Sequence, residues 1–203
     1  MERTSSDGQV SARFSTRQIA VVGMLSAISI VLGLSGYGFI PLPTAKATIM
    51  HIPIIIGAIL EGPAVGVMIG LIFGLFSIIQ AVTVPTLLSF AFINPLVSVL
   101  PRVLIGISAY YTYYYTYKYI FKKREFLSVA LGAAAGTLTN TIGVLGMIYL
   151  LYVAEFAAAR GMSTEAAAKV IYSIGLVHGL PEILVSIVIC TPVIMMLNKR
   201  RKG

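Results

Sequence analysis

The stretch PAVGVMIGLIFGLFSIIQAV, residues 63–82, is twenty residues long and carries no charged side chain. A transmembrane helix needs about 20 predominantly apolar residues, because each residue rises about 1.5 Å and the hydrocarbon core is about 30 Å thick. Gly62, Gly66, Gly70 and Gly74 recur at every fourth position along it. Small residues at this spacing share one helix face and let a neighbouring backbone approach closely. The stretch therefore predicts a membrane-spanning helix that packs tightly inside a bundle.

The composition extends this prediction to the whole chain. Its 203 residues are 58% hydrophobic and 11% charged, with a mean hydropathy of +0.93. Soluble domains carry about 25% charged residues, so an ordinary soluble domain is excluded. Apolar runs predict six spans, at residues 18–34, 47–60, 63–82, 93–118, 126–153 and 170–197. We predict an all-α integral membrane protein, a compact bundle of six transmembrane helices with no separate soluble domain.

The net charge is +8, and the basic residues are concentrated in three places. Most Lys and Arg residues lie in the N-terminal tail, in the segment 118–125 and at the C-terminus, next to apolar runs. This is the positive-inside pattern of membrane proteins, so both termini are predicted to be cytoplasmic and no nucleic-acid partner is expected. Residues 1–17 are predicted to form a disordered cytoplasmic tail, 18–197 the membrane domain and 198–203 a basic cytoplasmic C-terminal tail.

Seven tyrosines lie between residues 110 and 119, just before the basic segment 118–125. Tyrosine prefers the headgroup region of a bilayer, where its ring is shielded and its hydroxyl is wet. We therefore interpret this run as a belt at the membrane surface rather than as a platform for stacking bases.

Five polar residues fall inside the predicted spans: Asn94, Arg102, Asn140, His178 and Glu182. A charged side chain at mid-bilayer costs at least ~2.5–3.5 kcal/mol, so intramembrane Arg and Glu are candidates for function. Arg102 lies about 8 residues, or ~12 Å, into its span. His178 and Glu182 are four residues apart and share a helix face. These groups lie at similar depth and are predicted to converge on a cavity that opens to the outside.

The segment FINPLVSVLPRVLIG, residues 92–106, adds local detail. Asn94 can cap a helix, and Pro95 suits its first position because no amide is needed there. Pro101 lies inside the helix and leaves a backbone carbonyl without its usual donor. A structural alternative stays open, in which Arg102 and Glu182 simply pair with each other.

Other kinds of chemistry find little support in the sequence. The chain contains no HExxH, no GxSxG and no phosphate-binding loop, so no catalytic residues are predicted. His51 joins His178 and Glu182 as a conceivable metal ligand, but this set has no further motif, and neither metal nor cofactor is expected. Because there is no nucleotide motif, the chain is expected to bind a solute but not to pump it alone. A stand-alone secondary transporter is the alternative from another class.

Taken together, these features resemble the substrate-binding S components of energy-coupling factor (ECF) vitamin transporters. They comprise a short basic tail, a Gly/Pro-rich first loop SGYGFIPLPTAK, six spans and an intramembrane polar cluster. The segments IMHIPIIIGAILEGPAVGVMIGLIFGLFS (residues 49–77) and FINPLVSVLPRVLIG are most similar to members that bind pantothenate. The resemblance implies a multi-pass protein of the bacterial cell membrane. It also implies vitamin binding from outside and assembly with a transmembrane T component and two cytosolic ATPases.

The resemblance also implies residue roles. Substrate contacts map onto the five polar residues above and, more loosely, onto Tyr37 and His51. Contact with the T component maps onto Gly23 and Ala27, where glycine replaces the first alanine of the AxxxA pattern of the family.

The identity of the vitamin follows from the charge of the site. Pantothenate carries a carboxylate, which Arg102 can bind through charge-assisted hydrogen bonds. If Glu182 neutralises Arg102 instead, a neutral ligand such as pyridoxine or a hydroxymethylpyrimidine fits better. Riboflavin and folate are further alternatives, which a scarcity of aromatic residues at mid-membrane disfavours.

Overall fold

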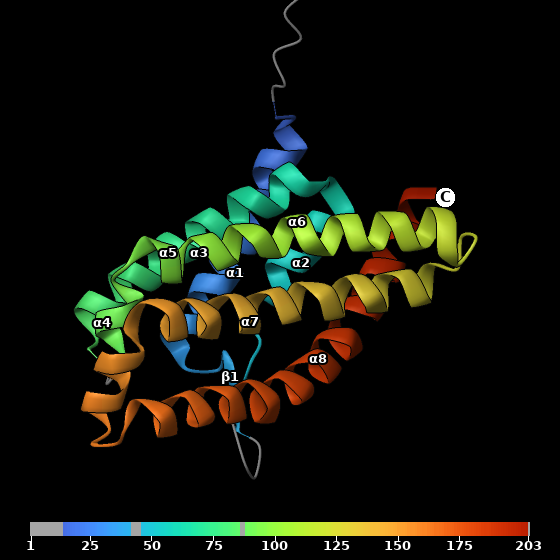
Figure 1. Cartoon of the computed structure of the whole chain (residues 1–203). Coiled ribbons are helices and arrows are strands. Elements are labelled where there is room, and N and C mark those ends of the chain that lie inside the picture. Colours follow the sequence, from blue (N-terminus) through green and yellow to red (C-terminus); the bar gives the residue numbers. More distant parts are fainter. Residues whose placement is uncertain (1–13, 42–45, 86–87, 203) are drawn as a thin grey trace, which may run out of the picture.

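The computed structural model describes residues 14–41, 46–85 and 88–202 (Figure 1). The expectations for the start of the N-terminal tail (1–13), the tip of the first loop (42–45), residues 86–87 and residue 203 lie outside the described residues. The elements in chain order are α1 (Thr16–Ser35), β1 (Phe39–Pro41), β2 (Lys46–Thr48), α2 (Ile52–Glu61), α3 (Pro63–Thr83), α4 (Ser89–Phe92), α5 (Pro95–Ser98), α6 (Leu100–Tyr115), a π-helical turn (Thr116–Ile120), α7 (Glu125–Ala159) and α8 (Thr164–Lys202).

The prediction of an all-α membrane bundle is confirmed, with one small addition. Five helical segments are long and apolar enough to cross a bilayer: α1, α3, the stretch Pro95–Ile120, α7 and α8. The addition is an antiparallel ribbon of three-residue strands, β1 and β2. The helix α2 has ten residues, which is short for a span, so the count of six spans remains a prediction.

The ten-residue helix α2 forms the centre of the bundle. Eight of its ten residues are buried, and it contacts α1, α3, α6, α7 and α8. The preceding residues 47–51 are not helical, yet they belong to the apolar run 47–60. Irregular backbone at membrane depth is tolerated where protein surrounds it. The run 47–60 therefore looks like a span in the sequence, although its residues before α2 form a β-strand and a turn.

The glycine pattern of α3 acts as predicted. A Cβ atom built on Gly66 would lie 2.8 Å from the Cα atom of Gly106, and one built on Gly70 would collide with the backbone of Arg102. These glycines let α3 and α6 approach closely. Gly62 has a different role: its φ of 102° makes the turn between α2 and α3, a conformation that L side chains rarely adopt.

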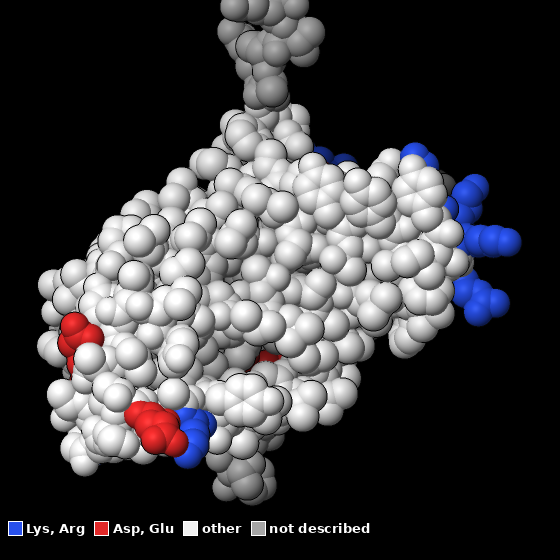
Figure 2. Space-filling view, viewed as in Figure 1, with Lys and Arg blue, Asp and Glu red and all other residues white. Residues whose placement is uncertain are grey.

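The helices α6, α7 and α8 lie side by side in this order (Figure 1). With 35 and 39 residues, α7 and α8 are longer than a bilayer core requires. Charged side chains lie at the ends of these helices on the visible face (Figure 2). Lys and Arg gather where α6 turns into α7 and where α8 ends, and the other end carries a mixture of acidic and basic groups.

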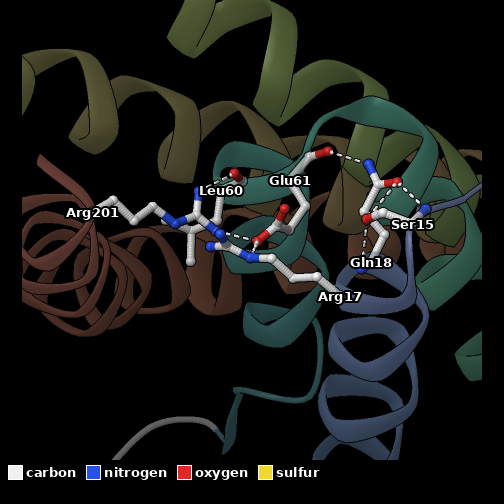
Figure 3. Close-up of polar contacts among 6 residues, drawn as sticks. All are labelled: Ser15, Arg17, Gln18, Leu60, Glu61 and Arg201. Carbon is white, nitrogen blue, oxygen red and sulfur yellow. Dashed lines mark hydrogen bonds and ion pairs between the residues drawn. The ribbon is translucent and has the colours of Figure 1, made fainter.

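The carboxylate of Glu61 connects the start of α1 to the end of α8 (Figure 3). Glu61, at the end of α2, accepts a hydrogen bond from Arg17 Nε at 3.1 Å and also pairs with Arg201 on α8. Arg201 donates a further hydrogen bond to the carbonyl of Leu60 at 2.6 Å, and Gln18 donates to the carbonyl of Glu61 at 3.3 Å. The beginning of α1 and the end of α8 therefore lie at one end of the bundle. Their cytoplasmic location remains a prediction.

Candidate functional site

The position of Arg102 follows from the proline before it. Because Pro101 has no amide hydrogen, the carbonyl of Val97, four residues earlier, cannot make its helical hydrogen bond. The guanidinium of Arg102 provides the missing donor, with Nη1 2.7 Å from the Val97 oxygen. The side chain is only 7% exposed. The predicted orphan carbonyl thus holds the arginine inside the bundle.

The guanidinium lies between two aromatic rings and retains unused hydrogen-bonding capacity. Its Cζ atom is 5.8 Å from the ring centre of Phe73 on α3 and 5.6 Å from that of Phe92 on α4. Its Nε atom is buried and has no hydrogen-bond partner. Among the described residues, no carboxylate forms an ion pair with Arg102. The expected scarcity of aromatic residues at mid-membrane is therefore wrong near Arg102.

Glu182 is engaged elsewhere. Its Oε1 accepts a hydrogen bond from the backbone amide of Thr48 at 2.9 Å, and its Oε2 accepts one from Thr141 Oγ1 at 3.1 Å. The side chain belongs to α8 and is 5% exposed. The carboxylate therefore joins the ribbon strand β2 to α7 and α8. The alternative in which Glu182 neutralises Arg102 is wrong, because each group has different partners.

Two further buried polar groups accompany Arg102. His51 is completely buried just before α2; its Nε2 lies 3.0 Å from Thr137 Oγ1, while its Nδ1 has no partner. Asn140, one helical turn along α7 from Thr137, has a buried side-chain oxygen without a partner. More than about 90% of buried polar groups in proteins are hydrogen-bonded. The orphan atoms on His51, Arg102 and Asn140 are therefore unusual, and the hydroxyls of Ser26, Ser29 and Thr191 are buried without partners as well.

A groove lies between α7 and α8, and its lining includes none of the five predicted polar residues. It has a volume of about 550 Å³ and a mainly apolar lining that includes Leu138, Leu145 and Ile171. Thr141, which bonds Glu182, is one of its polar lining residues. Sites for small molecules are typically ~300–1,000 Å³ in volume, mostly apolar and equipped with few polar groups. In Figure 2 one acidic group is visible inside a hollow in the middle of the face shown.

The remaining predicted residues occupy different surroundings. Asn94 caps α5 as predicted, accepting from the amide of Leu96 at 2.9 Å. Its amide group also donates to the hydroxyl of Tyr152 at 2.9 Å, where α7 departs from helical geometry. Tyr37 is 79% exposed beyond the end of α1. His178 is half-buried and lies within electrostatic reach of Glu182. The structure places His51 within electrostatic reach of Arg102 and His178 within reach of Glu182, whereas Asn94 bonds Leu96 and Tyr152 and Tyr37 is exposed.

Sequence reasoning missed several partners in this region. The segment TLTNT, residues 137–141, contains three threonines, and two of them bond His51 and Glu182. Thr48 gave no signal, because Glu182 recognises its backbone amide rather than its side chain. The contacts of Phe73 and Phe92 with Arg102 could not be predicted either, because an aromatic residue in an apolar run does not indicate which residue it contacts.

Removal of the Glu182 carboxylate is expected to loosen the ribbon. In Glu182→Ala the Thr48 amide loses its acceptor, and a hydrogen bond to a charged group contributes about 1.5–3 kcal/mol. Hydrogen exchange at Thr48 is expected to accelerate by one to two orders of magnitude. Glu182→Gln retains an acceptor oxygen and serves as the matched control, with a smaller increase. Equal exchange in wild type and Glu182→Ala would show that the contact does not hold the ribbon.

Comparison with known proteins identifies the class of this bundle. Residues 17–194 match the family model described as "ECF transporter, substrate-specific component". The chain is 30% identical over 203 residues to the pantothenic acid transporter PanT of Lactococcus lactis subsp. cremoris, covering 91% of this chain and 95% of that protein. It is 33% identical over 115 residues to the pantothenate transporter PanT of Leuconostoc mesenteroides, covering 53% and 55% of the two chains.

A solved structure has the same fold. ThiT from Listeria monocytogenes superimposes with a TM-score of 0.61 at 15% sequence identity, covering 90% of this chain and 96% of that one. The chain therefore belongs to the family of substrate-specific components of ECF transporters. It is a multi-pass protein of the bacterial cell membrane and a subunit for transport.

Proposed function

We propose that this chain is the high-affinity pantothenate-binding subunit of an ECF importer. The names of the two relatives support this choice of vitamin. The observation that carries it is the buried Arg102, whose guanidinium retains an unused donor and has no carboxylate partner among the described residues. An uncompensated cation at this depth is costly unless an anion joins it. A vitamin with one carboxylate meets this requirement, and a neutral vitamin does not.

Each part of pantothenate has a proposed counterpart. Arg102 binds the carboxylate through charge-assisted hydrogen bonds, since its Nε has no other hydrogen-bond partner. His51 Nδ1 and the side-chain oxygen of Asn140 serve the hydroxyl and amide groups. Glu182 contributes by holding β2 over the site, and His178 lies beside it. Asn94 acts indirectly through Tyr152, while Tyr37 is the weakest member of the set.

Identification of the bound molecule tests this proposal. The detergent-purified protein is examined by native mass spectrometry, and any small molecule released on unfolding is identified. Pantothenate is the expected result. Recovery of pyridoxine, a hydroxymethylpyrimidine, riboflavin or folate would retain the family and contradict the assignment of the vitamin. A protein that is empty and that ignores a panel of these vitamins would contradict the binding role.

We further propose that transport requires partners. A T component would share the membrane with this chain, and two cytosolic ATPases would hydrolyse ATP, since this chain has no nucleotide motif. The outer face of α1 is suited to the T component: Gly23 and Ala27 are exposed, and a Cβ atom on Gly23 would meet nothing within 4 Å. Met24 and Val31 expose 66% and 60% of their surfaces on the same helix.

Enlarging this face is expected to block assembly while preserving binding. Gly23→Leu combined with Ala27→Leu adds bulk where two helices would approach closely. Co-purification of the T component and ATPases is expected to fall at least about tenfold, while pantothenate affinity stays unchanged. Val188→Leu, which adds bulk at an exposed apolar position on α8 outside the groove between α7 and α8, is the control. Unimpaired assembly of the double variant would place the partner elsewhere, and pantothenate uptake by liposomes that contain this chain alone would favour a secondary transporter.

A further inference from the structure

The end of α6 carries an ordered set of tyrosines around a lysine. Tyr110 stacks on Tyr114 and Tyr115 stacks on Tyr119, each with ring centres 6.0 Å apart. Lys118 Nζ lies 5.3 Å from the ring centre of Tyr114 and 5.1 Å from that of Tyr119, and it donates a hydrogen bond to the Tyr114 hydroxyl at 3.1 Å. The rings and the hydroxyl thus favour one position of the exposed ammonium group.

The next turn shows backbone strain at two lysines. Lys122 and Lys123 have φ angles of 44° and 73°, in the left-handed region that residues other than glycine rarely adopt. Both side chains are exposed, as is that of Arg124. Glycine would adopt these angles without strain. Lysine at these two positions therefore makes the turn less stable and exposes two positive charges. Strain of this kind is found mainly where function requires the geometry.

The charges at this end have few counterions. Among the described residues, the ion pairs use Glu61 and Glu165 and involve none of Lys118, Lys122, Lys123 and Arg124. The nearby carboxylate of Glu125 accepts a hydrogen bond from Asn198. Figure 2 shows the basic groups projecting from this end without an acidic neighbour on the visible face.

An exposed apolar stripe leads from the middle of α6 to this basic end. Leu104, Ile107, Tyr111 and Tyr115 are 40%, 36%, 45% and 54% exposed, and they recur at helical spacing on one face. Lys118 and Tyr119 continue the same face into the π-helical turn Thr116–Ile120. In a membrane such a stripe contacts acyl chains, and its basic end lies at the depth of the headgroups.

We propose that this surface is a binding site for an anionic phospholipid. Lys118, Lys122 and Lys123 bind the headgroup phosphate, the tyrosine hydroxyls donate further hydrogen bonds, and one acyl chain lies along the stripe from Leu104 to Tyr115. The cations supply charge complementarity, and the favoured position of Lys118 distinguishes a site from general attraction between a basic tail and a charged membrane. The proposal is independent of the vitamin that the protein binds.

Lipid retention tests the proposal. The full chain is placed in mixed micelles with equal amounts of phosphatidylglycerol and phosphatidylcholine, and native mass spectrometry counts the lipids that stay bound. Wild type is expected to prefer phosphatidylglycerol. Lys118→Gln alone is expected to weaken this preference about fivefold, since each cation near the surface contributes about 1 kcal/mol. The triple variant Lys118→Gln, Lys122→Gln, Lys123→Gln is expected to lose most of it.

Matched controls separate the site from net charge and from folding. Lys169→Gln removes one cation at the other end of α8, where it pairs with Glu165, and is expected to leave the preference unchanged. Equal retention of both lipids by wild type would overturn the proposal, as would an unchanged preference in Lys118→Gln. Displacement of the lipid by soluble glycerol phosphate would overturn it too, by indicating a site for soluble phosphate. A triple variant with full lipid preference but lost co-purifying protein would assign the surface to a protein partner.

Discussion

Replacement of Arg102 by alanine is expected to abolish pantothenate binding while the bundle stays folded. Loss of one partner from a buried, hydrogen-bonded charge pair costs about 2–5 kcal/mol, which corresponds to a loss of affinity between roughly 30-fold and several thousandfold. The bundle is expected to stay folded, because the guanidinium donates one hydrogen bond within the described structure, to Val97, and its Nε has no partner. Isothermal titration with pantothenate measures the affinity, and thermal unfolding in detergent measures the stability.

Arg102→Lys is the informative control for this prediction. Lysine retains the positive charge but lacks the planar fork that bonds a carboxylate at two points. Affinity is expected to fall between those of wild type and Arg102→Ala. If Arg102→Ala binds pantothenate normally, the carboxylate lies elsewhere. If it unfolds at a much lower temperature, the arginine has a structural role that its contacts do not account for.

Gly70→Ala is expected to cause the largest loss of stability among single small substitutions. The added Cβ atom would collide with the backbone of Arg102, and backbone cannot yield as the end of a side chain can. Overpacking of this kind costs about 1–3 kcal/mol. Separation of α3 from α6 also displaces Arg102, so pantothenate affinity is expected to fall together with the unfolding temperature.

Gly146→Ala is the matched control for this substitution. It makes the same change within α7, where an added Cβ atom meets nothing within 4 Å. Because alanine favours helix over glycine by about 0.5–1 kcal/mol, this variant is expected to be as stable as wild type or more stable. If both variants unfold at the same temperature, the packing of α3 on α6 is looser than the contacts indicate.

Much of the fold could be predicted from the sequence, because membrane helices must satisfy their backbone internally and therefore appear as long apolar runs. The run 63–82 predicted α3 (Pro63–Thr83) closely, and its glycine spacing predicted close helix packing, which the structure shows against α6. The sequence could not predict the ribbon before α2. Its strands have three residues each, and α2 is apolar on all sides because it is central.

The candidate site could be predicted only in part. Residue type and depth singled out Arg102 and Glu182, and Pro101 predicted the orphan carbonyl that holds the arginine. Their partners could not be predicted, since both depend on how distant segments meet. The Thr48 amide reaches Glu182 across 134 residues of sequence, and the rings beside Arg102 come from α3 and α4. The simpler hypothesis was that Arg102 and Glu182 pair with each other. The structure excludes it, because each side chain contacts other groups.

The central claim is that Arg102 recognises the carboxylate of a bound pantothenate. The most direct test compares two ligands on the wild-type protein by isothermal titration: pantothenate and the alcohol in which its carboxylate is reduced to a hydroxymethyl group. The two differ in the group that Arg102 would contact. Wild type is expected to bind pantothenate at least about thirtyfold more tightly, and Arg102→Ala is expected to lose this discrimination. Equal affinity of wild type for the acid and the alcohol would contradict the account.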